Sequence, residues 1–63
     1  MLNKKQVVRM FRDEILPSIR ERYEQDRRID YPARREAWNN YTDALHKNGM
    51  ISDHAVNSWE CPW

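Results

Sequence analysis

Cys61 is the only cysteine in a chain of 63 residues, so no disulfide within the chain can stabilise its fold. Chains this short bury only about 60% of the surface that they expose when unfolded, and their stability is expected to be marginal. No spacing of histidines and cysteines matches a structural zinc site. A packed core must therefore stabilise the fold, and three tryptophans, three tyrosines and one phenylalanine can supply it.

The chain shows no signal for a membrane or for export. It has no apolar stretch of membrane-spanning length, and its first residues, MLNKKQVVRMF, lack the apolar core of a signal peptide. We therefore expect a cytoplasmic protein without a membrane partner, which also agrees with the single cysteine. One third of the residues are charged, yet the net charge is only +1. Near neutrality argues against an acidic DNA mimic and gives little support to a general nucleic-acid binder.

Apolar side chains recur at three- and four-residue steps in three segments, and the chain has one glycine and few β-branched residues. These patterns predict an all-α fold in which residues 1–63 form a single domain. We expect three helices, at about 4–26, 32–48 and 53–60. Pro17 should kink or break the first helix between Asp13 and Pro17, because proline lacks an amide proton and crowds a preceding carbonyl.

The expected helix ends carry recognisable capping residues. Asn3 and Gln6 have the spacing of a capping box, and Ser52 is placed to cap the short last helix. Gly49 fits the left-handed position that ends the second helix. The apolar faces predict a core of Phe11, Ile15, Ile19, Trp38, Tyr41, Leu45, Val56 and Trp59. We expect the last two tryptophans, Trp59 and Trp63, to cover one end of the three helices.

The sequence contains no glycine-rich phosphate loop, no nucleophile elbow and no singular pair of acids, so we expect neither an enzyme nor a cofactor. The best ligands for a metal are His46, His54 and Cys61, but their spacing matches no recurrent pattern and we predict no metal site. The second and third helices have the outline of a helix-turn-helix. However, residues 48–63 contain no lysine or arginine to contact bases or phosphates.

Two sets of residues are candidates for binding a partner. Arg34 and Arg35, with Trp38 nearby, either cover apolar surface with their stems or form an exposed patch of the residue types that dominate interfaces. Trp59 and Trp63 are either core residues or anchors for a partner. If these two tryptophans are exposed, a homodimer could bury them.

Charge is distributed unevenly along the chain. Residues 1–35 contain ten Lys or Arg against six acids, whereas residues 36–63 contain one Lys against four acids. This asymmetry either steers an encounter or reflects ordinary solvated helix faces. A nucleic-acid-associated protein is the alternative function that it suggests. The residues that would contact phosphates are Lys4, Lys5, Arg9, Arg27 and Arg28.

The segment RIDYPARREAWNNYTDALHKNGMISDHAVNSW resembles a group of short, uncharacterised proteins from bacteriophages and prophages. The resemblance rests on PARREAWNNYTDALHKNG, followed by IS and a tryptophan near the end of the chain. It covers the second half well and the first half loosely. It implies a small accessory protein that acts inside an infected bacterium, and it assigns no active-site residue. Together with the residue patterns, it leads us to expect a non-enzymatic protein that binds a macromolecular partner, either a host or a phage protein.

Overall fold

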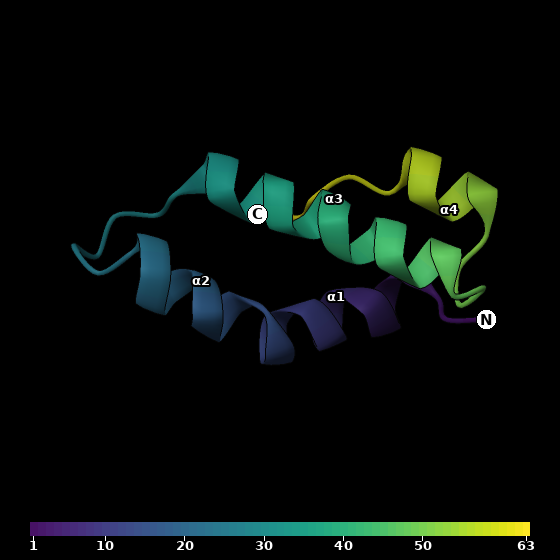
Figure 1. The fold of residues 1–63 in the computed structure, drawn as a ribbon, viewed down its shortest axis with the longest axis horizontal. Coiled ribbons are helices and arrows are strands. Elements are labelled where there is room, and N and C mark those ends of the chain that lie inside the picture. The colour runs from purple at the N-terminus through teal and green to yellow at the C-terminus, as the bar shows by residue number, and fades with distance from the viewer.

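The computed structural model describes residues 1–63 and contains four helices and no strand, which confirms the predicted all-α fold (Figure 1). The helices are α1 (Lys4–Glu14), α2 (Leu16–Tyr23), α3 (Tyr31–Lys47) and α4 (Asp53–Ser58). Figure 1 shows α1 and α2 following one another along one side of the molecule, with α3 running back beside both of them. The short α4 packs on α3, and the molecule measures 36 × 18 × 17 Å.

The predicted first helix is divided into α1 and α2 at Ile15, within the interval where we expected a kink or a break. Pro17 lies in the first turn of α2, where its missing amide proton is tolerated. The Ile15 amide still donates to the Phe11 carbonyl at 2.8 Å, so α2 continues the direction of α1 with a local distortion. The prediction for Pro17 is therefore confirmed.

The capping residues locate the helix ends better than the spacing of the apolar residues does. The Asn3 capping box is formed, and the side chains of Asp30 and Ser52 accept amide protons from the first turns of α3 and α4. The expected extent of the first helix to residue 26 is wrong, because α2 ends at Tyr23. Glu24 leaves helical geometry, and its carboxylate accepts the Asp30 amide proton. Likewise α4 ends at Ser58 and not at residue 60.

The turn between α3 and α4 is a Schellman motif, as the position of Gly49 predicts. Gly49 has a φ of +73°, and its amide donates to the His46 carbonyl at 3.0 Å. The Met50 amide donates to the Leu45 carbonyl at 2.9 Å. The Leu2 amide then donates to the Met50 carbonyl at 2.9 Å, which ties the start of the chain to this turn.

The core lies between α3 and the pair α1 and α2. Its buried apolar side chains are Val7, Phe11, Leu16, Ile19, Trp38, Leu45, Ile51 and Ala55. Half of the predicted core is correct, whereas Ile15, Tyr41, Val56 and Trp59 are only partly buried and pack on its edge. The break at Ile15 explains one difference from the predicted core, because it places Leu16 in the core in place of Ile15.

Aromatic rings close the middle of the core. The ring centroids of Phe11 and Trp38 lie 5.3 Å apart with the planes near perpendicular, a favourable arrangement. The partly buried Trp63 ring reaches back over both, with centroids 5.3 Å from Phe11 and 6.5 Å from Trp38. Residues 60–63 make no backbone–backbone hydrogen bond. Side-chain contacts therefore hold this last segment on the helices.

Candidate partner-binding surface

The predicted exposed patch around Arg34 and Trp38 does not exist. Arg34 is only 6% exposed and Trp38 is fully buried, whereas Arg35 is exposed. Trp38 is enclosed by Phe11 and Trp63, and Arg34 lies one turn before it on the inner face of α3. The alternative in which these two residues form a free partner surface is therefore wrong. The other alternative, in which the Arg34 stem covers apolar surface, agrees with its burial.

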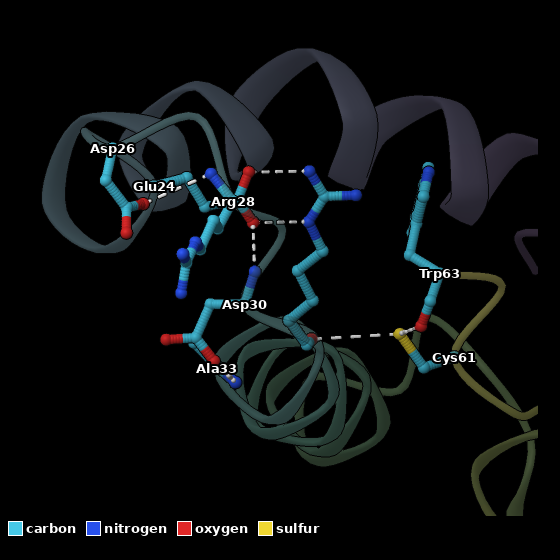
Figure 2. A network of polar contacts seen from close by, with 8 residues as sticks. Glu24, Asp26, Arg28, Asp30, Ala33, Cys61 and Trp63 are labelled. Atoms are coloured by element: carbon cyan, nitrogen blue, oxygen red, sulfur yellow. Dashed lines mark hydrogen bonds and ion pairs between the residues drawn. The ribbon is translucent and has the colours of Figure 1, made fainter.

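The Arg34 guanidinium forms a two-pronged ion pair with the Glu24 carboxylate, shown in Figure 2. Nε donates to Oε2 and Nη2 donates to Oε1, both at 2.7 Å. The side chains of the two residues are 7% and 6% exposed. Glu24 Oε2 also accepts the Asp30 amide proton at 3.1 Å. One carboxylate thus joins the end of α2, the start of α3 and the loop between them.

Both members of this ion pair stay charged at neutral pH. The Arg34 hydrogen bonds lower the pKa of Glu24 against the opposing effect of burial, and the Asp30 amide lowers it further. The same hydrogen bonds raise the pKa of Arg34. Charge-assisted, two-pronged pairing of this kind fixes geometry as well as charge. The loop is therefore held in one arrangement by a buried ionic contact.

Local bonds order the rest of the loop, residues 24–30. The Arg28 amide donates to the Asp26 carboxylate at 3.1 Å, and Asp30 accepts the Ala33 amide proton at 3.0 Å as the cap of α3 (Figure 2). Arg27 has a φ of +67°, in the left-handed region that few residues other than glycine adopt. One residue with a positive φ and three hydrogen bonds from backbone amides to carboxylates therefore give this loop a defined conformation.

Exposed apolar and basic side chains lie in this loop and at the ends of α2 and α3 that it joins. Tyr23, Ile29 and Tyr31 are 56%, 49% and 52% exposed, and Arg27 and Arg28 are exposed beside them in the chain. We call these five residues the loop-end surface. Tyrosine and arginine are the residue types enriched where interfaces are strongest.

A hollow of about 360 Å³ adjoins the loop-end surface, between the end of α2 and the first turns of α3. Tyr23 forms one wall, while Pro32, Ala33 and Ala37 provide an apolar floor and Asp30 and Glu36 contribute carboxylates. No basic side chain lines it. A partner side chain with an apolar stem and a positive end would match this lining.

The other predicted partner residues, Arg35, Trp59 and Trp63, do come together. They line a groove of about 630 Å³ between α3 and residues 56–63, whose lining residues are Arg35, Asn39, Val56, Asn57, Trp59, Glu60, Cys61 and Trp63. Both tryptophans are partly buried, and the Trp59 carbonyl accepts the Trp38 indole proton at 3.4 Å. Each ring therefore has a packing role and offers only part of its surface to a partner.

The predicted phosphate contacts are divided between two places. Lys4, Lys5 and Arg9 lie on α1, whereas Arg27 and Arg28 lie in the loop at the opposite end of the long axis (Figure 1). The structure therefore does not gather these five cations into one surface. It adds Arg12 to the α1 group, around the partly buried Val8.

The structure contains no group of side chains suited to holding a metal ion. No three His, Cys, Asp or Glu side chains come together, and His46 forms an ion pair with Asp53. The Cys61 thiol donates to the Arg34 and Trp63 carbonyls, at 3.8 and 3.5 Å. No buried side-chain nitrogen or oxygen lacks a hydrogen-bond partner.

The pKa of Tyr41 is raised by burial and by Glu14, its hydrogen-bond partner at 3.4 Å.

No protein-family model, curated protein or solved structure matches the chain. None of the four helices combines the length and the hydropathy that crossing a bilayer requires. The arrangement of side chains is therefore the basis for a functional proposal.

Sequence reasoning missed Tyr23, Ile29 and Tyr31. Tyr23 continues the apolar period of the first helix, and this continuity suggested burial, but α2 ends there and the ring stays exposed. Ile29 did offer a signal. It stands alone in the polar segment EQDRRID, outside any helical period, where an apolar side chain has no core to join.

Proposed function

We propose that this chain is a non-enzymatic interaction protein that binds a partner protein through the loop-end surface. The observation that carries the proposal is the exposure of Ile29 in the α2–α3 loop and of Tyr23 and Tyr31 at the two helix ends that this loop joins, next to the buried Glu24–Arg34 pair. The other two large apolar side chains with high exposure, Met1 and Met50, line a separate hollow beside the start of the chain. Three of the five therefore lie in or next to the α2–α3 loop, and exposed apolar side chains that lie close together favour a binding role over random scatter.

The fixed loop conformation also favours binding. A partner that meets an ordered loop does not have to order it, so less of the contact energy is lost to conformational entropy. Arg27 and Arg28 add long-range attraction toward an acidic region of the partner. The hollow beside Tyr23 would receive a partner side chain with a positive end.

The resemblance to short phage and prophage proteins supports the biological part of the proposal. It suggests an accessory protein in the cytoplasm of an infected bacterium, with a host or phage protein as the partner. The small size of the chain agrees with a role carried out by contact alone.

The test compares partner capture by three tagged chains. In the first variant, Tyr23→Ser, Ile29→Ser and Tyr31→Ser remove the apolar contacts of the loop-end surface. In the matched control, Met50→Ser changes an exposed apolar residue at the other end. We expect a purified candidate partner from host or phage lysate to bind the native chain and the control, and to lose binding to the triple variant. Equal binding to all three chains, with helical circular dichroism unchanged, would overturn the proposal.

A nucleic-acid-associated role remains the second candidate, since Lys4, Lys5 and Arg9 form no ion pair with any carboxylate. If it is correct, labelled duplex DNA is retained at low salt and released as salt rises, because phosphate contacts release counterions. Absence of retention at low salt eliminates it.

A further inference from the structure

One side of α1 is a continuous basic face. At 3.6 residues per turn, its five positions fall within about 140° of the helix circumference. They line one shallow hollow and are Lys4, Lys5, Val8, Arg9 and Arg12. We call them the α1 basic face. It lies at the other end of the molecule from the loop-end surface, so the two surfaces can act independently (Figure 1).

The charges of the α1 basic face are not neutralised by the fold. Lys4, Lys5 and Arg9 form no ion pair, and Arg12 contacts only its neighbour Asp13, at 3.2 Å and with both side chains largely exposed. The first turn of α1 contains no acid. Exposed pairs of this type contribute little to stability. The fold therefore gives no stabilising reason for gathering four cations here.

The spacing of this face suits another helix. Lys4, Val8 and Arg12 form one ridge at four-residue steps, and Lys5 and Arg9 form a second ridge beside it. Each step advances about 6 Å along the helix, the same repeat that any α-helix presents along its own four-residue ridges. Val8 is only partly buried against the core, so it adds apolar contact within the charged ridge.

We infer that the α1 basic face binds an acidic amphipathic helix of a partner protein. Glutamates at four-residue steps on that helix would meet both basic ridges, and an apolar residue between them would meet Val8. A phosphate backbone fits less well, because only four cations are available and the net charge of the chain is +1. This inference goes beyond the proposed function, since it adds a second surface that does not depend on the first.

The experiment titrates the whole chain with defined probes. The main probe is a synthetic helical peptide of about five turns, with glutamate and leucine at four-residue steps. Three further probes are its glutamine counterpart, the same acidic peptide interrupted by proline, and a short single-stranded DNA. The variant is Lys5→Glu with Arg9→Glu. Arg22→Glu, which changes an exposed unpaired arginine on α2, is the matched control.

We expect the acidic helical peptide to bind at low salt and to weaken as salt rises. The double variant should weaken it by on the order of tenfold or more, whereas the Arg22 control should change it little. The glutamine and proline peptides should bind poorly. No binding of the acidic helix, or equal binding of DNA or of the proline-interrupted peptide, would overturn the inference. None of these results depends on whether the loop-end surface binds its own partner.

Discussion

The two connections that flank α3 are built in different ways. The α2–α3 loop is held by the Glu24 carboxylate, which accepts protons from the Arg34 guanidinium and from the Asp30 backbone amide. The α3–α4 turn is held mainly by backbone bonds around Gly49, with its φ of +73°, and the His46–Asp53 ion pair spans it. The first connection keeps a longer loop in place and presents exposed rings. The second reverses the chain, ties the Leu2 amide to the Met50 carbonyl and docks the buried Ile51.

The difference shows which connection can be altered by conditions. The backbone bonds of the α3–α4 turn depend on local conformation, which neither salt nor moderate pH changes. The His46–Asp53 ion pair that spans this turn has a largely exposed Asp53 side chain, and exposed pairs contribute little to stability. A carboxylate-based connection depends on the ionisation of one group and on two partners being present. The loop that we propose as the partner-binding surface is therefore also the connection that is sensitive to acid.

The largest effect is expected from Arg34→Met, which leaves the Glu24 carboxylate buried without its main partner. Removing one member of a buried pair costs far more than removing both. We expect a marked fall in the denaturation midpoint, with amide exchange at Asp30 and Ala33 accelerated on the order of tenfold. The double change Arg34→Met with Glu24→Leu should recover most of the lost stability. If the single variant is as stable as the native chain, the ion pair does not hold the loop.

A lower pH should produce the next effect. Because the pKa of Glu24 in the folded chain lies below its ordinary value of 4.5, the pair stabilises the fold above that value. This stability is lost as pH falls through the folded pKa. Denaturant titrations at decreasing pH should show the loss in the native chain and a smaller loss in Glu24→Gln. Parallel curves for the two chains would contradict the assigned role of Glu24.

Gly49→Ala tests the other connection. An added Cβ would meet no atom within 4 Å, so the expected cost comes only from the left-handed backbone. We predict a loss of about 1–2 kcal/mol in the free energy of unfolding. The loss should be the same at neutral and at acidic pH, in contrast to the Glu24 variants. A pH-dependent loss would show that the two connections are not as separate as the structure indicates.

The smallest effect in the series is expected from Ser52→Ala. The Ser52 hydroxyl accepts the Ala55 amide proton at 3.1 Å and caps the six-residue α4. Its removal should cost about 0.5–1 kcal/mol. Hydrogen exchange should increase within α4 and leave the α2–α3 loop unchanged. Faster exchange in that loop would mean that α4 supports it through α3.

Much of the fold was predictable because it depends on local chemistry. The Asn3 box, the Ser52 cap, Gly49 and Pro17 each act within a few residues, and each was placed correctly. The spacing of the apolar residues located the helices, but it did not show which side chain faces the core at the break between α1 and α2. Leu16 and not Ile15 enters the core at the distortion, whereas Ile19, one turn later, is buried as predicted.

The candidate site could not be predicted in the same way, because it depends on contacts between distant residues. Glu24 and Arg34 are ten positions apart, and nothing in their spacing reveals that they meet. Without that contact, the choice between a packed Arg34 stem and an exposed Arg34 stays open, and Tyr23 reads as part of an apolar face. The structure shows that Arg34 is buried and that Tyr23 is exposed. Only Ile29, alone among polar residues, could have pointed to the loop from the sequence.

The weak attachment of residues 60–63 has a consequence for the aromatic core. No backbone–backbone hydrogen bond holds this segment. The Cys61 thiol donates to the Arg34 carbonyl, and the Trp63 ring packs on Phe11 and Trp38. Solvent is therefore kept from this side of the aromatic core by side chains outside the helices, and replacing Trp63 with a small residue would uncover the two inner rings without removing a helical hydrogen bond.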